Sequence, residues 1–283
     1  MGGLISRYYI SQIMEANSPD GRPKISHLIM LGTPNMGSPC ADVMDIAFGM
    51  VGKSVEAVRQ LTPGYVSGFN RINTQRKGVK FSALAGNPLP TMCKEIVAND
   101  GVVSVPSAKW IVKDTAESGN IHTDLTGTSD FSSFVKPRLA IGPKGNHDPE
   151  IPTTSSRMQN SEAGLVNVAY RPDTLANVIT SSDIDFARAV KIAPKQSVEI
   201  EIPVAEAMNF GLTFMAVPDV SASLIDDKST VVGKNLAKTP EASGWFRSIF
   251  FDRPTSTGTW KLRLENTSEF SAEIVLATWK RSL

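Results

Sequence analysis

The chain of 283 residues is long enough for two domains of ordinary size, each with its own buried core. Its 29 basic and 28 acidic residues give a formal net charge of +1, which argues against nucleic acid or another polyanion as a partner. No run of eighteen apolar residues occurs, so no membrane-spanning helix is encoded. Two cysteines are too few for a disulfide scaffold or a zinc site.

The first predicted element is an amphipathic helix over residues 2–16. Apolar side chains recur there at intervals of three or four residues, which is the period of one helix face. These side chains are Leu4, Ile5, Tyr8, Tyr9, Ile13 and Met14. The helix is expected to end at residues 17–21, because the proline and the glycine in that segment cannot continue it.

Two buried strands are predicted next, over residues 25–31 and 79–85. Each is a largely apolar run, as expected for strands of a parallel sheet that is covered on both faces. The first strand ends at Gly32-Thr33-Pro34, and open α/β sheets bind ligands at the carboxyl ends of their strands. His27 lies inside the first strand and is interpreted as a structural histidine.

The segment between these strands is predicted to be helical over residues 41–61. Leu61-Thr62-Pro63-Gly64 interrupts that helix, since proline and glycine together mark a turn. Residues 69–73 are then predicted to form a polar loop. Further along, residues 102–108 are expected to lead towards the last strand, and the apolar residues of 131–139 indicate a final helix.

An acid on a turn and a lone histidine are the strongest functional signals. Asp100 lies in the segment 99–103, on a predicted turn at the end of an apolar run. His122 comes some twenty residues later. A carboxylate can orient an imidazole and stabilise its protonated form, and the imidazole can take a proton from a serine hydroxyl. In chain order that serine belongs upstream, in a Gly-x-Ser-x-Gly elbow. Met1-Gly2-Gly3 fits the end of such an elbow, so the nucleophile is expected one position before Met1.

Four motifs in this order resemble the C-terminal half of a lipase-like α/β-hydrolase. They are Met1-Gly2-Gly3, Gly32-Thr33-Pro34, Asn99-Asp100-Gly101-Val102-Val103 and His122. The resemblance is strongest to the branch that holds bacterial triacylglycerol lipases, GPI-inositol-deacylase-like proteins and lecithin acyltransferase-like enzymes. It covers residues 1–140 and implies an α/β fold with only the C-terminal strands of the hydrolase sheet. The serine and the earlier strands have no counterpart in this sequence.

The resemblance implies a role for each matching residue. Asp100 would be the acid and His122 the base of the triad. The backbone N–H of Met1, with Gly2 beside it on the elbow, would stabilise the oxyanion. Three further residues would line the substrate pocket, namely Thr33, Pro34 and Met36. Ester hydrolysis by such a triad needs no metal or organic cofactor, and the substrate would be a small-molecule or lipid ester.

Two other functions remain open. An acyltransferase or amidase could use the same triad, and a non-catalytic binding or accessory module belongs to a different class altogether. An extracellular or periplasmic location is expected. The missing upstream strand would leave residues 25–31 as an exposed sheet edge, available to a second copy or to the missing half. Cys40 and Cys93 could form a disulfide or remain free thiols.

The second domain is predicted to be a β-sandwich over residues 162–283, after a linker over residues 141–161 rich in Pro, Gly, Ser and Asn. Short alternating segments indicate strands at 165–170, 186–192, 198–202, 212–217, 245–251, 260–264 and 270–279. The domain loosely resembles bacterial pre-peptidase C-terminal and P-type domains. Four aspartates could bind calcium, although turn formation is the preferred interpretation. They are Asp183, Asp185, Asp226 and Asp227.

Overall fold

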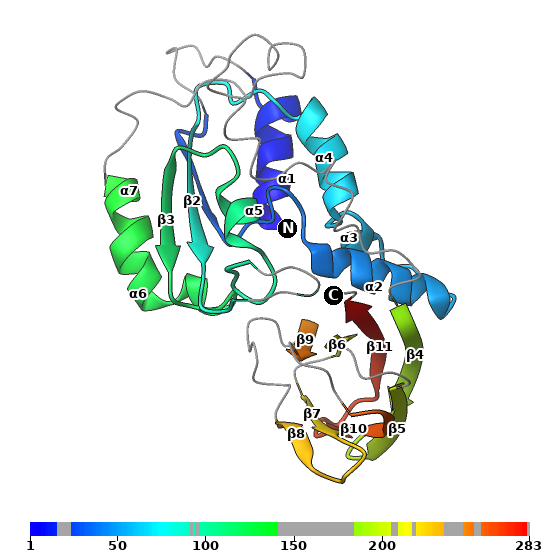
Figure 1. Ribbon diagram of the computed structural model, residues 1–283. Coiled ribbons are helices and arrows are strands. Elements are labelled where there is room, and N and C mark those ends of the chain that lie inside the picture. Colours follow the sequence, from blue (N-terminus) through cyan, green and yellow to red (C-terminus); the bar gives the residue numbers. More distant parts are fainter. Residues whose placement is uncertain are drawn as a thin grey trace. The chain divides into compact units, whose positions relative to one another are not determined.

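The computed structural model describes residues 1–15, 24–90, 93, 97–140, 184–204, 209–216, 219–234, 246–251 and 256–281 (Figure 1). The chain divides into two compact units. The first unit takes its described residues from Met1–Ser38, Gln60–Pro88 and Ala98–Ala176, and the second from Pro39–Arg59, Leu89–Val97 and Asn177–Leu283. The linker predicted over residues 141–161 lies outside the described residues, and the domain boundaries on either side of it stay a prediction.

The first unit is built on a parallel sheet whose described strands have the order β1-β2-β3. The strands are β1 (His27–Leu31), β2 (Lys80–Gly86) and β3 (Asp114–Ser118). Successive side chains of a strand point to opposite faces of the sheet. Leu28 and Met30 accordingly belong to one apolar cluster, and Ile29 and Leu31 to another. Both faces are covered, and the first two predicted strands are confirmed.

Helices lie on both sides of this sheet, as Figure 1 shows for α1 and α4 on one side and α6 and α7 on the other. Helix α1 (Gly2–Tyr8) continues into the π-helical turn η1 (Tyr9–Ile13), which confirms the predicted first helix. The other helical elements of this unit are α4 (Pro63–Ile72), α5 (Val105–Lys109), η2 (Asp124–Thr126), α6 (Thr128–Asp130), η3 (Phe131–Val135) and α7 (Lys136–Ala140). The predicted final helix is therefore confirmed.

One local prediction in this unit is wrong. The segment predicted as a polar loop, residues 69–73, lies almost entirely in α4. Pro63 does not stop a helix there but begins one, because proline is well tolerated in a first turn, and Thr62 Oγ1 accepts a hydrogen bond from the Tyr65 N–H (3.4 Å). Residues 102–108 do lead towards the last strand β3, as predicted, and they contain part of the short helix α5, whose N-cap is Ser104.

The second unit contains two antiparallel sheets with the strand orders β5-β10-β7-β8 and β4-β11-β6-β9. The strands are β4 (Ile184–Ile192), β5 (Ser197–Val204), β6 (Asn209–Met215), β7 (Val220–Ile225), β8 (Val231–Lys234), β9 (Phe246–Phe251), β10 (Gly258–Asn266) and β11 (Ala272–Arg281). One apolar core takes side chains from both sheets, among them Trp260, Leu262 and Leu276. This arrangement is a β-sandwich.

The predicted strands of the sandwich are confirmed where the structure describes them. The strand predicted at 165–170 lies outside the described residues. Strands β7 and β8 were not predicted, because β7 alternates apolar residues with serine and β8 has only four residues. In β10 the buried residues alternate with exposed ones, as the period of the sequence predicts.

Helices α2 (Pro39–Met50) and α3 (Glu56–Arg59) fall in the second unit. Helix α2 packs against β11 and β4, with Val43, Met44 and Ala47 fully buried. A disulfide joins Cys40 of α2 to Cys93, whose Cα atoms lie 5.6 Å apart, so the first of the two alternatives for these cysteines is confirmed.

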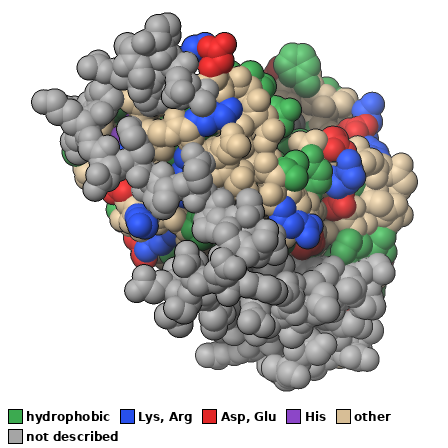
Figure 2. Space-filling view, turned by 90° about the horizontal axis from the view of Figure 1, so that it is seen from above, with side chains coloured by type: hydrophobic (Ala, Val, Ile, Leu, Met, Phe, Trp, Pro, Cys, Tyr) green, Lys and Arg blue, Asp and Glu red, His purple; other side chains and the backbone are tan. Residues whose placement is uncertain are grey.

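The surface carries charges of both signs. Figure 2 shows Lys and Arg side chains lying close to Asp and Glu side chains on one face, with polar and apolar groups between them. This mixture agrees with the net charge of +1. Among the described helices, none is long and apolar enough to cross a membrane.

Candidate functional site

The acid of the predicted pair lies on a tightly hydrogen-bonded loop that follows β2. Asp100 is fully buried, and its Oδ1 atom accepts hydrogen bonds from the N–H groups of Val102 (3.0 Å) and Val103 (2.7 Å). The neighbouring Gly101 has a φ of +95°, a left-handed conformation that glycine adopts without strain. The loop therefore fixes the carboxylate with one oxygen left for another partner.

That partner is His122. The Oδ2 atom of Asp100 lies 2.7 Å from Nδ1 of His122, and the N–H of His122 donates to the carbonyl of Asp100 (3.0 Å). A carboxylate only accepts hydrogen bonds, so Nδ1 is the donor and Nε2 of a neutral imidazole carries the free lone pair. The side chain of His122 is 28% exposed, whereas that of Asp100 is 0% exposed. The pair thus has a buried acid and an accessible base.

Two glycines at the ends of β1 and β2 allow this pair to form. A Cβ atom at Gly32 would lie 2.8 Å from His122 Nδ1 and 2.9 Å from Asp100 Oδ2, and the φ of Gly32 is +55°. A Cβ atom at Gly86 would lie 2.6 Å from Cβ of Asp100. Real Cβ atoms do not approach other atoms so closely, so both positions need glycine. The acid and the base therefore lie at the carboxyl ends of the parallel strands, the edge expected from the sequence.

The remaining predicted site residues lie around the first turn of α1. A Cβ atom at Gly3 would lie 2.2 Å from Oγ1 of Thr33, so this turn packs directly on the segment that follows β1. Thr33 and Pro34 are buried, and Met36 is partly buried, with its N–H donating to Ser107 Oγ (3.1 Å). A Cβ atom at Gly2 would meet nothing within 4 Å, which leaves open space beside the start of the helix.

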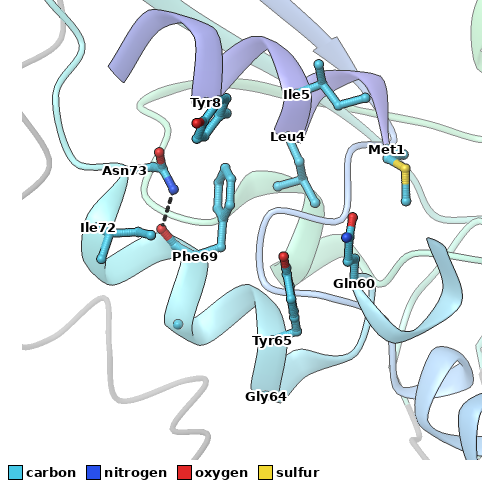
Figure 3. A pocket seen from close by; sticks show the side chains of 11 residues that line it. Met1, Leu4, Ile5, Tyr8, Gln60, Gly64, Tyr65, Phe69, Ile72 and Asn73 are labelled. Atoms are coloured by element: carbon cyan, nitrogen blue, oxygen red, sulfur yellow. Dashed lines mark hydrogen bonds between the residues drawn. The ribbon is translucent and has the colours of Figure 1, made fainter. Parts of the chain in front are cut away.

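A groove that the sequence did not reveal runs between α1 and α4 and has a volume of about 550 Å³ (Figure 3). Leu4, Ile5 and Tyr8 line it from α1. Tyr65, Phe69 and Ile72 line it from α4. Figure 3 shows Met1 and Gln60 at one end and Ile72 and Asn73 at the other. Its size and its apolar lining are those of a small-molecule pocket.

The spacing of the α4 residues was the available signal for this groove. Tyr65, Phe69 and Ile72 recur at intervals of four and three residues, which is the period of a helix face. The segment 69–73 was instead predicted to be a loop. Even a correct helix prediction would not have placed α4 beside α1, because the two helices are separated by more than fifty residues of chain.

The other histidine with a predicted role is satisfied inside the sheet. Nε2 of His27 lies 2.6 Å from Ser82 Oγ, and Ser82 donates to Asp114 Oδ2 (2.5 Å). Burial, followed by the charge of Lys80, lowers the pKa of His27 below its usual value. These contacts agree with the structural interpretation of this residue.

The aspartates of the sandwich were interpreted as turn residues, which is wrong for Asp185, because it lies within strand β4, and agrees with the contacts of Asp226 and Asp227. Asp226 Oδ1 accepts hydrogen bonds from the N–H groups of Lys228 (3.0 Å) and Thr230 (2.7 Å). Asp227 accepts a hydrogen bond from Ser256. Asp183 lies outside the described residues. Among those that are described, no three His, Cys, Asp or Glu side chains are grouped as metal ligands.

The chain matches no protein-family model and no curated protein sequence. It is similar to solved structures at low identity. The lipase BlEst2 of Bacillus licheniformis, in its propeptide form, matches with 16% identity and a TM-score of 0.48, over 99% of this chain and 58% of that chain. The chain therefore spans less than two thirds of the length of that lipase.

Two further structures match the chain over about a third of its length. The C-terminal CBM6 module of LamC, a laminarinase of Zobellia galactanivorans, has 12% identity and a TM-score of 0.19, over 35% of this chain and 94% of that chain. A de novo designed double-stranded β-helix has 14% identity and a TM-score of 0.20, over 33% of this chain and 97% of that chain.

Proposed function

We propose that this chain is part of a serine hydrolase that acts on carboxylic esters, with Asp100 and His122 as the acid and the base of its triad. The observation that carries the proposal is the 2.7 Å contact between Asp100 Oδ2 and His122 Nδ1. The acid is buried and held by two further N–H groups, while the imidazole is partly exposed. This is the division of roles that a triad needs, since the acid orients the base and the base meets substrate.

The nucleophile of the proposed enzyme is a serine immediately before Met1. Its hydroxyl attacks the ester carbonyl while Nε2 of His122 takes the hydroxyl proton. The tetrahedral intermediate collapses to an acyl-enzyme, and His122 gives the proton to the departing alcohol. Water then attacks the acyl group with the same proton transfers, which releases the acid and restores the serine. No metal or organic cofactor takes part.

The contacts of the first turn of α1 support this placement. Gly3 packs on Thr33, and Gly32, one residue earlier, touches the acid–base pair. The first turn of α1 therefore contacts Thr33, and the adjacent Gly32 contacts His122. The backbone N–H of Met1, with Gly2 beside it, is the proposed oxyanion donor, because N–H groups at a helix start point towards developing negative charge.

The groove between α1 and α4 supports an apolar acyl group in the substrate. Met1 lines one end of it, and from there the groove extends between the two helices to Ile72. Thr33, Pro34 and Met36 would contact the ester close to the reacting carbonyl. The proposed substrate is a small-molecule or lipid ester.

The rest of the chain is assigned supporting roles. The sandwich, residues 162–283 in the predicted division, is proposed as a non-catalytic accessory domain. An extracellular or periplasmic location is proposed, and the disulfide between Cys40 and Cys93 supports it, since disulfides persist in oxidising compartments.

A further strand is proposed to pair with β1, which is the outer strand among those described. Lys80 N–H donates to the carbonyl of Ser26, and Gly32 N–H donates to the carbonyl of Leu84. In a parallel pair only alternate residues bond to a given neighbour, so the N–H and C=O groups of His27, Ile29 and Leu31 point away from β2. The upstream half of the hydrolase domain is the proposed partner, and a second copy of this chain is the alternative.

The test compares this chain with a version extended upstream to include the elbow. A fluorophosphonate probe should label the extended protein on the serine before Met1 and should not label this chain. The variant H122A of the extended protein should lose labelling, and H27A is the matched control because His27 bonds to Ser82 and not to Asp100. Labelling that persists in H122A, or a residue other than serine before Met1, would refute the proposal.

A further inference from the structure

Arg7 is a fully buried cation without a carboxylate partner among the described residues. Its side chain is 1% exposed. Nη1 donates to Asn35 Oδ1 (3.0 Å) and Nη2 to Asn70 Oδ1 (2.7 Å), both of them uncharged acceptors. Burial, followed by the charge of Arg76, lowers the pKa of Arg7 to about 9. Placing a cation here is costly, because amide oxygens offset the loss of hydration less fully than a carboxylate does.

Two aromatic rings contribute to the environment of this cation. The guanidinium carbon lies 3.9 Å from the centroid of the Trp110 ring and 5.2 Å from that of Phe69. Nε of Arg7 has no hydrogen-bond partner within the part of the chain that the structure describes. Trp110 has a φ of +45°, which is strained for a residue with a large side chain. An apolar residue would fill the same space at lower cost, so the guanidinium has a more specific role than packing.

The acceptors of Arg7 belong to a network that fixes the segment 33–38. Asn35 Nδ2 donates to the carbonyl of Ala108 (3.0 Å), and Asn70 Nδ2 donates to the carbonyl of Asn35 (2.8 Å). Through its two Nη atoms and the Trp110 ring, Arg7 thus joins α1, this segment, α4 and the residues that follow α5. A planar fork with several donors can make these contacts at once, whereas the ammonium of lysine cannot.

Both ends of the segment 33–38 lead to the acid–base pair. Just before it, Gly32 lies in direct contact with His122 and Asp100. At its other end, Ser38 Oγ donates to the carbonyl of Val102 (2.7 Å), and the N–H of Val102 donates to Asp100 Oδ1 (3.0 Å). A displacement of the segment 33–38 would therefore displace the pair both through Gly32 and through Ser38.

We propose that Arg7 is a positioning residue for the Asp100–His122 pair. Arg7 holds Asn35, and with it the segment 33–38, in place. Gly32 and Ser38, at the two ends of this segment, then keep Asp100 in contact with the imidazole of His122. The consequence for catalysis rests on the proposed function. The effect on the geometry of the pair does not, because it follows from contacts that exist in this chain without a nucleophile.

The test is proton NMR of the full chain as it stands. The Nδ1 proton of His122, held against Asp100, gives a low-field resonance whose exchange with water reports local opening of the pair. In R7M that exchange should become about tenfold faster, or the resonance should broaden beyond detection. The matched control is R138M. Arg138 also stacks on an aromatic ring, Phe134 at 3.6 Å, but it binds Asp114 and not the segment 33–38.

R138M should lower the melting temperature and leave the His122 resonance unchanged, which separates positioning from general stability. If R7M does not fold, N70A provides the same test, because it removes one of the two Arg7 acceptors. An unchanged resonance in a folded R7M, or in N70A when R7M is unfolded, would overturn the proposal. In the upstream-extended protein, slower fluorophosphonate labelling of the same variant would connect the positioning to catalysis. Absence of labelling in the unsubstituted extended protein would refute the proposed function alone.

Discussion

Asp100 and His122 are separated by 22 positions in the chain and by 2.7 Å between Oδ2 and Nδ1. The acid is inaccessible to solvent and the imidazole is not, so solvent and substrate reach the pair only through His122. The contact depends on the two glycines that end β1 and β2, since a side chain at either position would overlap the pair. The geometry of the site therefore depends on Gly32 and Gly86 as well as on Asp100 and His122.

This chain, as it stands, should not hydrolyse p-nitrophenyl esters above background. Three serines within the described part of the first unit each make a structural hydrogen bond. Ser6 Oγ donates to the carbonyl of Gly2, Ser38 Oγ donates to that of Val102, and Ser104 caps α5. Initial rates of the chain and of buffer should agree. Turnover that S38A or S104A abolishes would show that the proposed position of the nucleophile is wrong.

Substitution of the acid in the upstream-extended protein should affect catalysis more than folding. D100N retains the shape of the side chain but favours the wrong imidazole tautomer, so turnover should fall roughly ten-thousand-fold. H122A should cost roughly a millionfold, close to the loss of the whole triad, because the triad acts as a unit. Steady-state kinetics measure both. Near-normal turnover of D100N would assign the acid elsewhere, with Asp124 as the next candidate.

Gly32 should tolerate no side chain. G32A would place a methyl group against His122 and Asp100 in a backbone conformation with a φ of +55°, at a combined cost of about 2–4 kcal/mol. The matched control is G64A, because a Cβ atom there meets nothing within 4 Å. Thermal unfolding should show a lower melting temperature for G32A and an unchanged or higher one for G64A. Equal melting temperatures would contradict the contact of Gly32 with the pair.

Asp114 should make the first unit sensitive to acid. Burial raises the pKa of this carboxyl, but hydrogen bonds from Arg138 and Ser82 outweigh burial and lower the pKa to about 2 from its usual 3.8. The folded state therefore holds the proton less tightly than the unfolded state. The resulting stability is present above pH 3.8 and is lost as the pH falls towards 2.

Thermal melts between pH 5 and pH 2 test this expectation. D114N should already be less stable at pH 5, and its melting temperature should depend less on pH within that window. The control is D226N, because Asp226 closes a turn in the other unit, where its Oδ1 atom accepts hydrogen bonds from the N–H groups of Lys228 and Thr230. If the melting temperatures of the protein and of D114N fell equally between pH 5 and pH 2, the assigned role of Asp114 would be contradicted.

The local elements that the sequence predicted share one property, which is that their signal lies within a single segment. The helix that begins at Gly2 and the strands around Met30 and Ala83 follow from spacing and composition alone. The pair of Asp100 and His122 was predicted differently, from chain order, residue type and the resemblance of four separate motifs to a lipase-like hydrolase.

The features that the sequence did not predict depend on contacts between distant segments. Arg7, for which the sequence analysis predicted no role, is buried, and its guanidinium lies against the rings of Phe69 and Trp110. The groove exists because α4 lies beside α1. Pro63 was interpreted as a break, although proline is also the residue that most readily begins a helix, and sequence alone does not separate these two uses.

The outer edge of β1 should recruit another strand. The described part of the sheet gives the outward N–H and C=O groups of His27, Ile29 and Leu31 no partner, and an edge of this kind is a template for pairing. The N-terminal helical segment adds exposed apolar surface to the same unit, since Ile5 of α1 is 62% exposed and Ile13 of η1 is 60% exposed. We expect this chain to self-associate as its concentration rises, as measured by light scattering after size exclusion.

The edge can be blocked without disturbing the bonds between β1 and β2. In I29P the outward N–H of residue 29 is replaced by a proline ring, whereas the inward groups of Leu28 and Met30 are retained. The control is I29A, which also loses the isoleucine side chain but keeps that N–H. I29P should be monomeric where I29A and the unsubstituted chain associate. Hydrogen exchange gives a second measure, because an edge without a partner should leave the amides of Ile29 and Leu31 exchanging faster than those of Leu28 and Met30. A monomeric chain in which all four amides exchange equally slowly would show that the edge is already covered.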